Sequence, residues 1–247
     1  MDDLPDELIA HIFAHFPETG ALTAAMLVCW KWYMYGARLL HCRVVLNLRP
    51  GLSIHSSDTV ISFMKRLTSP ACSTADCIHH LTLCGFASLD IQELILDILG
   101  RTRALRSLTM CALNLLQGGM LLPPEIFSSP EFLPNLVALN AASAPFSVSL
   151  SHTRRISAIR VHEPMDETLL RRLLSPRSQL AVRIQNLELA LSVDSTAAAI
   201  TRMAYLASAL AEAPLHALAL QFTLDRPGPV PWTEFEVRPG SDLRRTH

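Results

Sequence analysis

The chain has 247 residues, of which 50% are hydrophobic and 17% are charged, and its formal net charge is −1. This length and apolar content support a folded protein with a buried core and argue against intrinsic disorder. The balanced charge also argues against nucleic-acid binding, which needs an excess of Lys and Arg to neutralise phosphates. The sequence contains no run near the roughly 18 apolar residues that a membrane-spanning helix needs.

The N-terminal residues and the cysteines both favour an intracellular protein. Met1-Asp2-Asp3 is acidic where a secretory signal is basic. Six cysteines lie in the first half of the chain without CxxC spacing, and several have apolar neighbours. We therefore expect reduced thiols and a location in the cytoplasm and/or the nucleus. The six are Cys29, Cys42, Cys72, Cys77, Cys84 and Cys111.

The first 48 residues predict three short helices. Apolar residues follow one helical face from Leu8 to Phe16, and Pro5 suits the first helical position. A second helix is predicted from Gly20 to Trp32, with Thr19 as its cap, and a short third helix around residues 37–40. The apolar surface of these helices is too large to be buried within the unit, so it needs a partner or a following domain.

The ordered motifs of this segment resemble an F-box. Leu4-Pro5-Asp6-Glu7-Leu8 is followed by Ile12-Phe13, then by Leu27-Val28-Cys29 and Trp32, and the end is similar to that of fungal F-box proteins. The resemblance covers residues 4–48 and implies docking onto the Skp-type adaptor of a cullin–RING (SCF-type) ubiquitin ligase. For the later apolar positions, packing within the three helices is the alternative. The adaptor-binding residues that the resemblance implies are Leu4, Pro5, Leu8, Ile12, Leu27, Val28 and Trp32.

From residue 43 to residue 224, an apolar-x-x-apolar-x-apolar pattern recurs seven times, about every 29 residues. Each copy predicts a short strand, and the copy around Leu46 is the weakest. Helical patterns alternate with the strands at residues 58–67, 89–99, 164–174 and 195–212. Residues 123–132 predict helical turns at best, and residues 144–155 show no helical pattern. The central residues of the seven copies are Leu46, Leu81, Leu108, Leu139, Ile159, Leu187 and Leu218.

This alternation resembles a leucine-rich-repeat solenoid with long, irregular units, in which parallel strands line a concave face and helices the convex face. The Asn or Cys that this family often places three residues after the third apolar position is absent here, and a doubly wound parallel sheet remains an alternative. We therefore expect an α/β protein. Its parts are a three-helix F-box domain (1–48), an irregular leucine-rich-repeat-like solenoid (49–224) and a Pro-rich C-terminal tail (225–247).

Motifs for catalysis and metal binding are weak. The sequence has no GxSxG, no phosphate-binding GxxxxGK[ST] and no GxGxxG. His11 and His15 lack the glutamate that a zinc protease places between them, and the cysteines near His79-His80 fit no compact zinc module. We therefore expect no catalytic residues, no cofactor and no metal.

We predict a substrate-recruiting adaptor subunit of an SCF-type ubiquitin ligase, which is not itself an enzyme. A protein substrate is expected to bind exposed positions between the apolar strand residues. The alternatives are an α/β enzyme with a helical N-terminal extension and a degenerate F-box protein without a ligase role. The candidate substrate-binding residues are Thr82, Ser107, Thr109, Asn140, Arg160 and Glu188.

Overall fold

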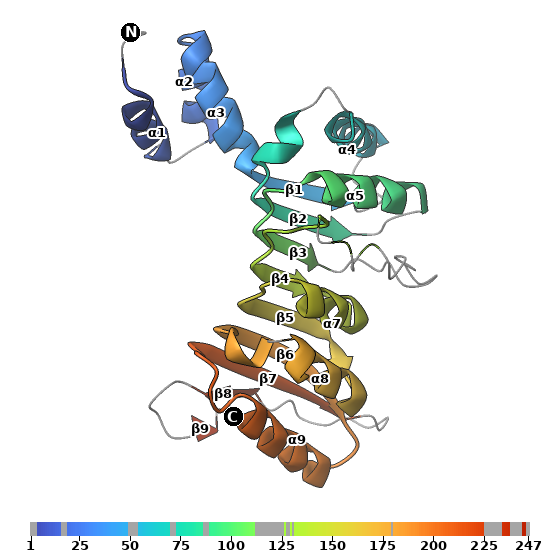
Figure 1. The fold of residues 1–247 in the computed structure, drawn as a ribbon. Helices are drawn as coiled ribbons and strands as arrows, with labels where there is room; N and C mark the ends of the chain where they lie inside the picture. The colour runs from blue at the N-terminus through green and yellow to red at the C-terminus, as the bar shows by residue number, and fades with distance from the viewer. Residues whose placement is uncertain are drawn as a thin grey trace.

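The computed structural model describes residues 4–15, 19–48, 54–69, 73–85, 89–111, 126, 129, 131–178, 180–224, 234–237 and 244–245. Helices α1 to α3, here called the helical unit, stand at one end of a long sheet (Figure 1). The strands of the sheet follow one another in chain order from β1 to β9. The first seven strands are parallel, whereas β8 and β9 pair in antiparallel fashion.

The helical unit has a small core of its own. It consists of α1 (Asp6–Ala14), α2 (Thr19–Met26) and α3 (Trp30–Cys42). The predicted helix from Gly20 to Trp32 is wrong in its second half, because α2 ends early and Cys29 has an extended backbone (φ −160°, ψ 168°) that caps α3. The third helix is correspondingly longer than predicted. The core residues of the helical unit are Ile9, Phe13 and Ala25, with Leu4, Leu22, Met26, Trp32 and Tyr35 packed against them.

The seven predicted repeats all form strands, and their register aligns them with one correction. Val44, and not Leu46, pairs with Leu81, so the first copy of the pattern was placed two residues too far along the chain. A doubly wound sheet reverses its strand order at a switch point, whereas this order has no reversal. The strands are β1 (Arg43–Leu48), β2 (His80–Gly85), β3 (Ser107–Cys111), β4 (Ala138–Ala141), β5 (Ala158–Met165), β6 (Asn186–Val193), β7 (Ala217–Leu224), β8 (Glu234–Val237) and β9 (Arg244–Arg245).

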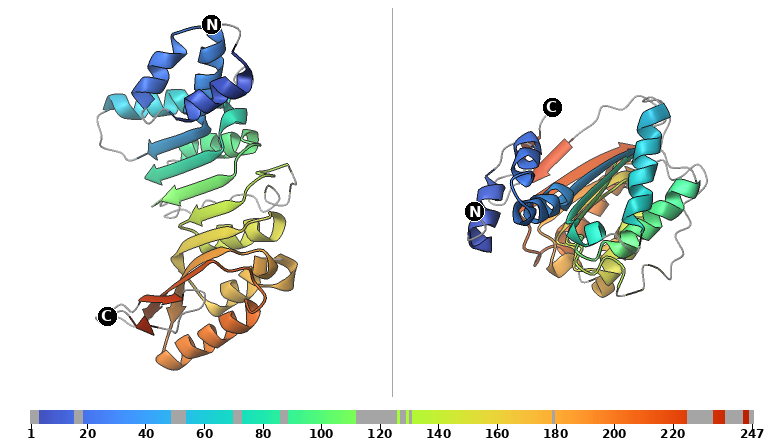
Figure 2. Two further views of the ribbon diagram at one scale, coloured as in Figure 1. Left: turned by 90° about the vertical axis from the view of Figure 1, so that its left-hand side faces the viewer. Right: turned by 90° about the horizontal axis from the view of Figure 1, so that it is seen from above.

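Helices cover one face of the sheet, as the view from above shows (Figure 2), and among the described residues no helix of the sheet region packs on the other face. Alternate strand residues such as Leu81, Leu108 and Leu139 point towards the helices and join one continuous core. The opposite residues form the open face. The covering helices are α4 (Ile54–Leu67), α5 (Leu89–Arg101), α7 (Ala144–Thr153), α8 (Glu167–Leu173) and α9 (Thr196–Ala209), with short 3-10 turns at Ser73–Cys77, Pro176–Ser178 and Leu180–Val182.

Helix α7 corrects the expectation that residues 144–155 lack helical structure. Pro145 lies in its first turn, where the missing N–H costs no hydrogen bond. Phe146, Val148 and Leu150 are buried, and so is the polar Ser147. A helix buried on several sides shows no amphipathic periodicity, which is why the sequence pattern did not reveal it.

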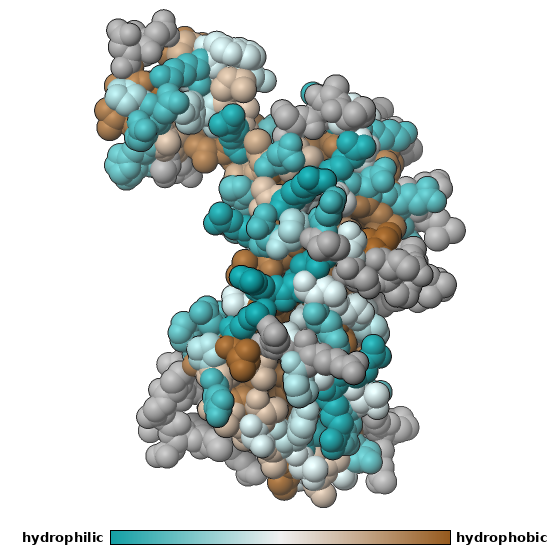
Figure 3. Space-filling model, viewed as in Figure 1, coloured by the Kyte–Doolittle hydropathy of each residue, from teal (hydrophilic) through white to brown (hydrophobic). Residues whose placement is uncertain are grey.

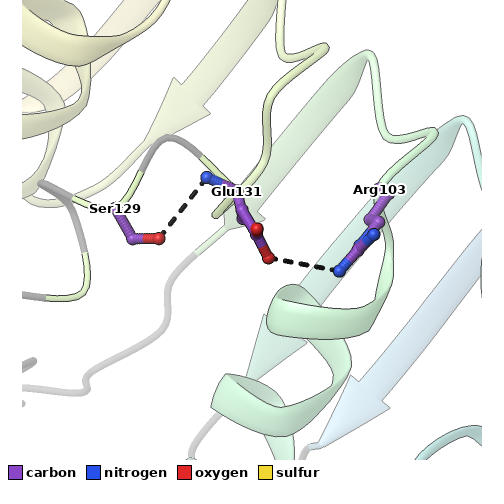
Figure 4. A network of polar contacts seen from close by, with 3 residues as sticks. All are labelled: Arg103, Ser129 and Glu131. Carbon is purple, nitrogen blue, oxygen red and sulfur yellow. Dashed lines mark hydrogen bonds and ion pairs between the residues drawn. The ribbon is translucent and has the colours of Figure 1, made fainter.

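The segment before β4, which includes Glu131 and Phe132, contacts residues that follow α5 and α7 through an ion pair and a hydrogen bond. Arg103 Nη2 lies 3.2 Å from Glu131 Oε2, and the Glu131 amide donates to Ser129 Oγ at 3.4 Å (Figure 4). The buried Arg154, just after α7, donates from Nε to the carbonyl of Phe132 at 2.6 Å. Most of the predicted turn region 123–132 and most of the predicted tail 225–247 lie outside the described residues, but β8 and β9 fall within that tail.

Candidate functional site

The outer face of α1 carries an apolar stripe. Ile9 and Phe13, one helical turn apart, are buried in the core of the helical unit. Leu8 and Ile12 each precede one of them and are 50% and 38% exposed. Large apolar side chains that remain outside a completed core indicate an interaction surface. Two of the residues that the F-box resemblance implies for adaptor binding are therefore accessible.

Hydrogen bonds and charge hold the start of α1 against α3. Lys31 Nζ donates to the Leu4 carbonyl at 2.8 Å and lies 2.9 Å from Asp6 Oδ1. Hydrogen bonds from Tyr35, and then from Lys31, hold the pKa of the Asp6 carboxyl below its ordinary value. Leu4 is half-buried against the core, and Pro5 is exposed as the N-cap of α1. The network thus fixes the position of the Leu4-Pro5 segment.

Leu27 and Val28 project from the link between α2 and α3. Because α2 ends at Met26, these two residues leave the helical core, and they are 86% and 50% exposed. Hydrophobic residues are visible at the surface of the helical unit in Figure 3. A shallow groove of about 440 Å³ runs beside Leu27. It is lined by Gly20, Thr23, Ala24, Met26, Leu27 and Tyr33.

Trp32 and its aromatic neighbours divide between the core and the surface. Trp32 is half-buried and meets Phe13 edge to face, with ring centroids 5.4 Å apart. Its Nε1 is buried and has no hydrogen-bond partner among the described residues. Trp30 is 73% exposed and stacks on Tyr33 at 5.3 Å. This surface pair was not predicted from the sequence, because it depends on the start of α3 at Trp30, after the extended Cys29.

The open face of the sheet contains a hollow of about 220 Å³ over β3 to β7. Ala138, Ala158, Ala217 and Ala219 belong to its lining, and their short side chains leave the sheet backbone close to the surface. Polar side chains surround them. These polar residues are Ser107, Asn140, Arg160, Asn186 and Glu188.

Four of the six predicted substrate-binding residues lie together in this hollow: Ser107, Asn140, Arg160 and Glu188. Thr82 and Thr109 are register partners on the same face but do not line the hollow. Asn186 and Ala217 also line the hollow and were not predicted. Both occupy the position just before the central apolar residue of a repeat, so the alternation that revealed Ser107 could have found them.

Two polar contacts cross between strands at the hollow. Arg160 Nη2 lies 2.7 Å from Glu188 Oε1, and His162 Nε2 lies 2.8 Å from Asn140 Oδ1. Both pairs are solvent-accessible. Arg160 and Glu188 place a positive and a negative group side by side at the hollow, whose floor is formed by the alanines.

The open face is more basic towards β1. Burial, and then the positive charge of Arg43, lowers the pKa of His80, and Arg106 adds to this effect. Arg43, His80 and Ser107 are register neighbours across β1, β2 and β3. The lowered pKa favours the neutral form of His80, so Arg43 supplies the positive charge at this end of the open face.

The residues weighed for metal binding do not assemble. Cys42 Sγ lies 3.5 Å from His79 Nδ1, while the next residue, His80, points to the open face; Cys72 lies outside the described residues. Within the described ranges, no group of three or more His, Cys, Asp or Glu side chains is arranged to hold a metal ion. Among the helices that the structure describes, none has the length and apolarity to cross a membrane.

Comparison with known families assigns the helical unit. Residues 1–46 match the family model for F-box-like domains, which covers the three helices and the first strand residues. The chain as a whole matches no curated protein. The chain therefore carries an N-terminal F-box-like domain followed by an α/β region with a seven-stranded parallel sheet.

Proposed function

We propose that this protein is a substrate-recruiting subunit of an SCF-type cullin–RING ubiquitin ligase. The F-box-like match supports this role, because F-box domains typically bind a Skp-type adaptor. One observation carries the proposal: Leu8 and Ile12 on α1, and Leu27 and Val28 after α2, are exposed although the core of the helical unit is already complete. Covering these side chains on association removes apolar surface from water.

In this proposal the sheet region is a leucine-rich-repeat-like solenoid that holds a protein substrate on its open face. The sequential strand order and the helices packed on a single face support the arrangement. The alanine-lined hollow, with Arg160 and Glu188 beside it, is the proposed centre of the substrate surface. Thr82 and Thr109 extend that surface towards β1.

The chain itself performs no covalent chemistry in this proposal. The partner complex transfers ubiquitin, and this subunit raises the effective concentration of substrate near the reacting groups. The complex works inside the cell, in the cytoplasm and/or the nucleus. Its partners are the Skp-type adaptor, the cullin complex and a protein substrate.

Co-expression with a Skp-type adaptor tests the docking step. The variant Leu8→Asp/Leu27→Asp places two charges on exposed apolar positions, so it should fold normally and lose the adaptor on co-purification. The matched control is Val182→Asp/Ile200→Asp, which changes two similarly exposed apolar residues outside the helical unit and should retain the adaptor. Failure of the well-folded wild-type protein to bind any Skp-type adaptor, or equal binding by both double variants, would contradict the proposal.

A further inference from the structure

Cys84 on β2 and Cys111 on β3 are direct register partners. Their neighbours Leu83 and Met110 are buried among the helices, so alternation puts both cysteines on the open face. Both are half-buried and therefore partly accessible to solvent. From the sequence these thiols are small apolar residues, whereas the sheet register places them side by side.

Adjacent strands of a sheet lie about 4.8 Å apart, and the Cα atoms of a disulfide lie about 4.4–6.8 Å apart. We propose that Cys84 and Cys111 form a redox-active dithiol that closes into a cross-strand disulfide by exchange with a low-molecular-weight disulfide of the oxidised glutathione class. The register already aligns the two thiols, so they can meet after only a local approach of β2 and β3.

The exchange takes place in two displacements. The thiolate of one cysteine attacks a sulfur of oxidised glutathione, which forms a mixed disulfide and expels one glutathione thiolate. The thiolate of the second cysteine then attacks the protein sulfur of that mixed disulfide and expels the second glutathione. Two protein thiols are oxidised to one disulfide, one glutathione disulfide is reduced to two thiols, and the two protons pass to the departing thiolates.

The position of the pair also explains why the link would be reversible. On parallel strands in register, the two Cβ atoms point the same way and stay near the strand spacing, which is wider than the ~3.8 Å mean Cβ separation of a relaxed disulfide. Closing the bond must draw β2 and β3 together at the surface, and a strained disulfide is reduced more readily than a structural one. Reduced glutathione would therefore reopen it.

The pair lies two residues beyond Thr82 and Thr109, on the same face of the same strands. Oxidation would therefore change the shape of the open face beside residues that are candidates for substrate binding. This regulatory consequence rests on the proposed function, whereas the dithiol chemistry does not.

The full-length chain, purified under reducing conditions and then exposed to oxidised glutathione, tests the dithiol. We expect a species that is lighter by two hydrogens and carries no glutathione, with a Cys84–Cys111 linked peptide pair after non-reducing proteolysis. Cys84→Ser and Cys111→Ser should each lose the linked pair completely and accumulate a mixed disulfide instead. Cys29→Ser, which removes a half-buried thiol from the helical unit, should retain the linked pair.

Phenylarsine oxide gives a second measurement that needs no oxidant, because a trivalent arsenical bridges two neighbouring thiolates. The wild-type chain and Cys29→Ser should retain it against a monothiol, and both single variants of the pair should release it. Separate glutathione adducts on Cys84 and Cys111 without a linked pair would overturn the proposal. None of these measurements requires an adaptor or a substrate, so a failure here is distinct from a failure of the ligase role.

Discussion

Arg160 on β5 and Glu188 on β6 are register partners on the open face of the sheet, and Arg160 Nη2 lies 2.7 Å from Glu188 Oε1. Their side chains are 49% and 41% exposed, so water screens the attraction between the two charges. An exposed ion pair of this kind contributes about 0–1 kcal/mol to stability. The pair therefore places two opposite charges beside the hollow but adds little to the stability of the fold.

Replacement of either residue should accordingly have a small effect on folding. We expect Arg160→Ala and Glu188→Ala each to lower the free energy of unfolding by less than about 1 kcal/mol, as measured by urea denaturation. Arg103→Ala provides a matched control, because Arg103 forms a more exposed pair with Glu131 (Figure 4). A loss several times larger for Arg160→Ala than for Arg103→Ala would show that the hollow depends structurally on the pair.

Arg154 has the opposite character, because its guanidinium is buried and bonded to main-chain carbonyls. Nε donates to Phe132, Nη1 to Thr153 at 2.8 Å and Nη2 to Ser129. Burial lowers the pKa of Arg154 from its ordinary value. Arg154→Met would remove these three bonds, so we expect a loss of about 1–3 kcal/mol in the free energy of unfolding.

The neighbouring Arg155 is exposed and makes a suitable control for the Arg154 variant. Arg155→Met makes the same substitution at the adjacent position and should leave the midpoint of urea denaturation nearly unchanged. Equal midpoints for the two variants would show that the carbonyl contacts of Arg154 contribute little.

Two helical glycines should respond in opposite ways to alanine. A Cβ on Gly36 of α3 would clash with Met26 Cγ, inside the core of the helical unit. Gly36→Ala should therefore lower the stability of that unit by about 1–3 kcal/mol through overpacking. A Cβ on Gly100 of α5 meets no atom within 4 Å, so Gly100→Ala should stabilise the chain by up to about 1 kcal/mol. Thermal unfolding followed by circular dichroism measures both effects, and an unchanged Gly36→Ala variant would contradict the packing argument.

The strands of the sheet were predictable because each has one buried face. Alternation of apolar and other residues is plain in β2 and β3, where Leu81, Leu83, Leu108 and Met110 are buried. It is hidden in β1, since Val45 is 63% exposed but as apolar as its buried neighbours Val44 and Leu46. The pattern therefore located the first strand and misplaced its register by two residues.

The candidate sites were less accessible to sequence reasoning, because they depend on where helices end and which strands become neighbours. The predicted helical pattern covers residues 89–99, whereas α5 continues to Arg101. The exposure of Trp30 follows from the break at Cys29, which no local pattern signals. Likewise, the pairing of Cys84 with Cys111 is a property of register between two segments that are far apart in the sequence.

We expect His41 to make the stability of the junction between the helical unit and the sheet depend on pH. It lies in the last turn of α3 and stacks on Phe63 of α4, with ring centroids 6.2 Å apart. Burial, and then the positive charge of Arg66, lowers the pKa of His41 below its ordinary value. As pH falls through the unfolded value of about 6.5, the unfolded chain binds a proton here before the folded chain does, so the free energy of unfolding decreases.

His41→Gln should remove this contribution. The substitution costs the same packing at every pH, so the informative quantity is the change in the free energy of unfolding between pH 8 and pH 5.5. That change should be smaller in His41→Gln than in the wild-type chain, as measured by urea denaturation at both pH values. If both proteins lose the same stability on acidification, His41 does not contribute to the pH dependence. The loss must then come from other groups. His80 is the first to test, because burial also lowers its pKa.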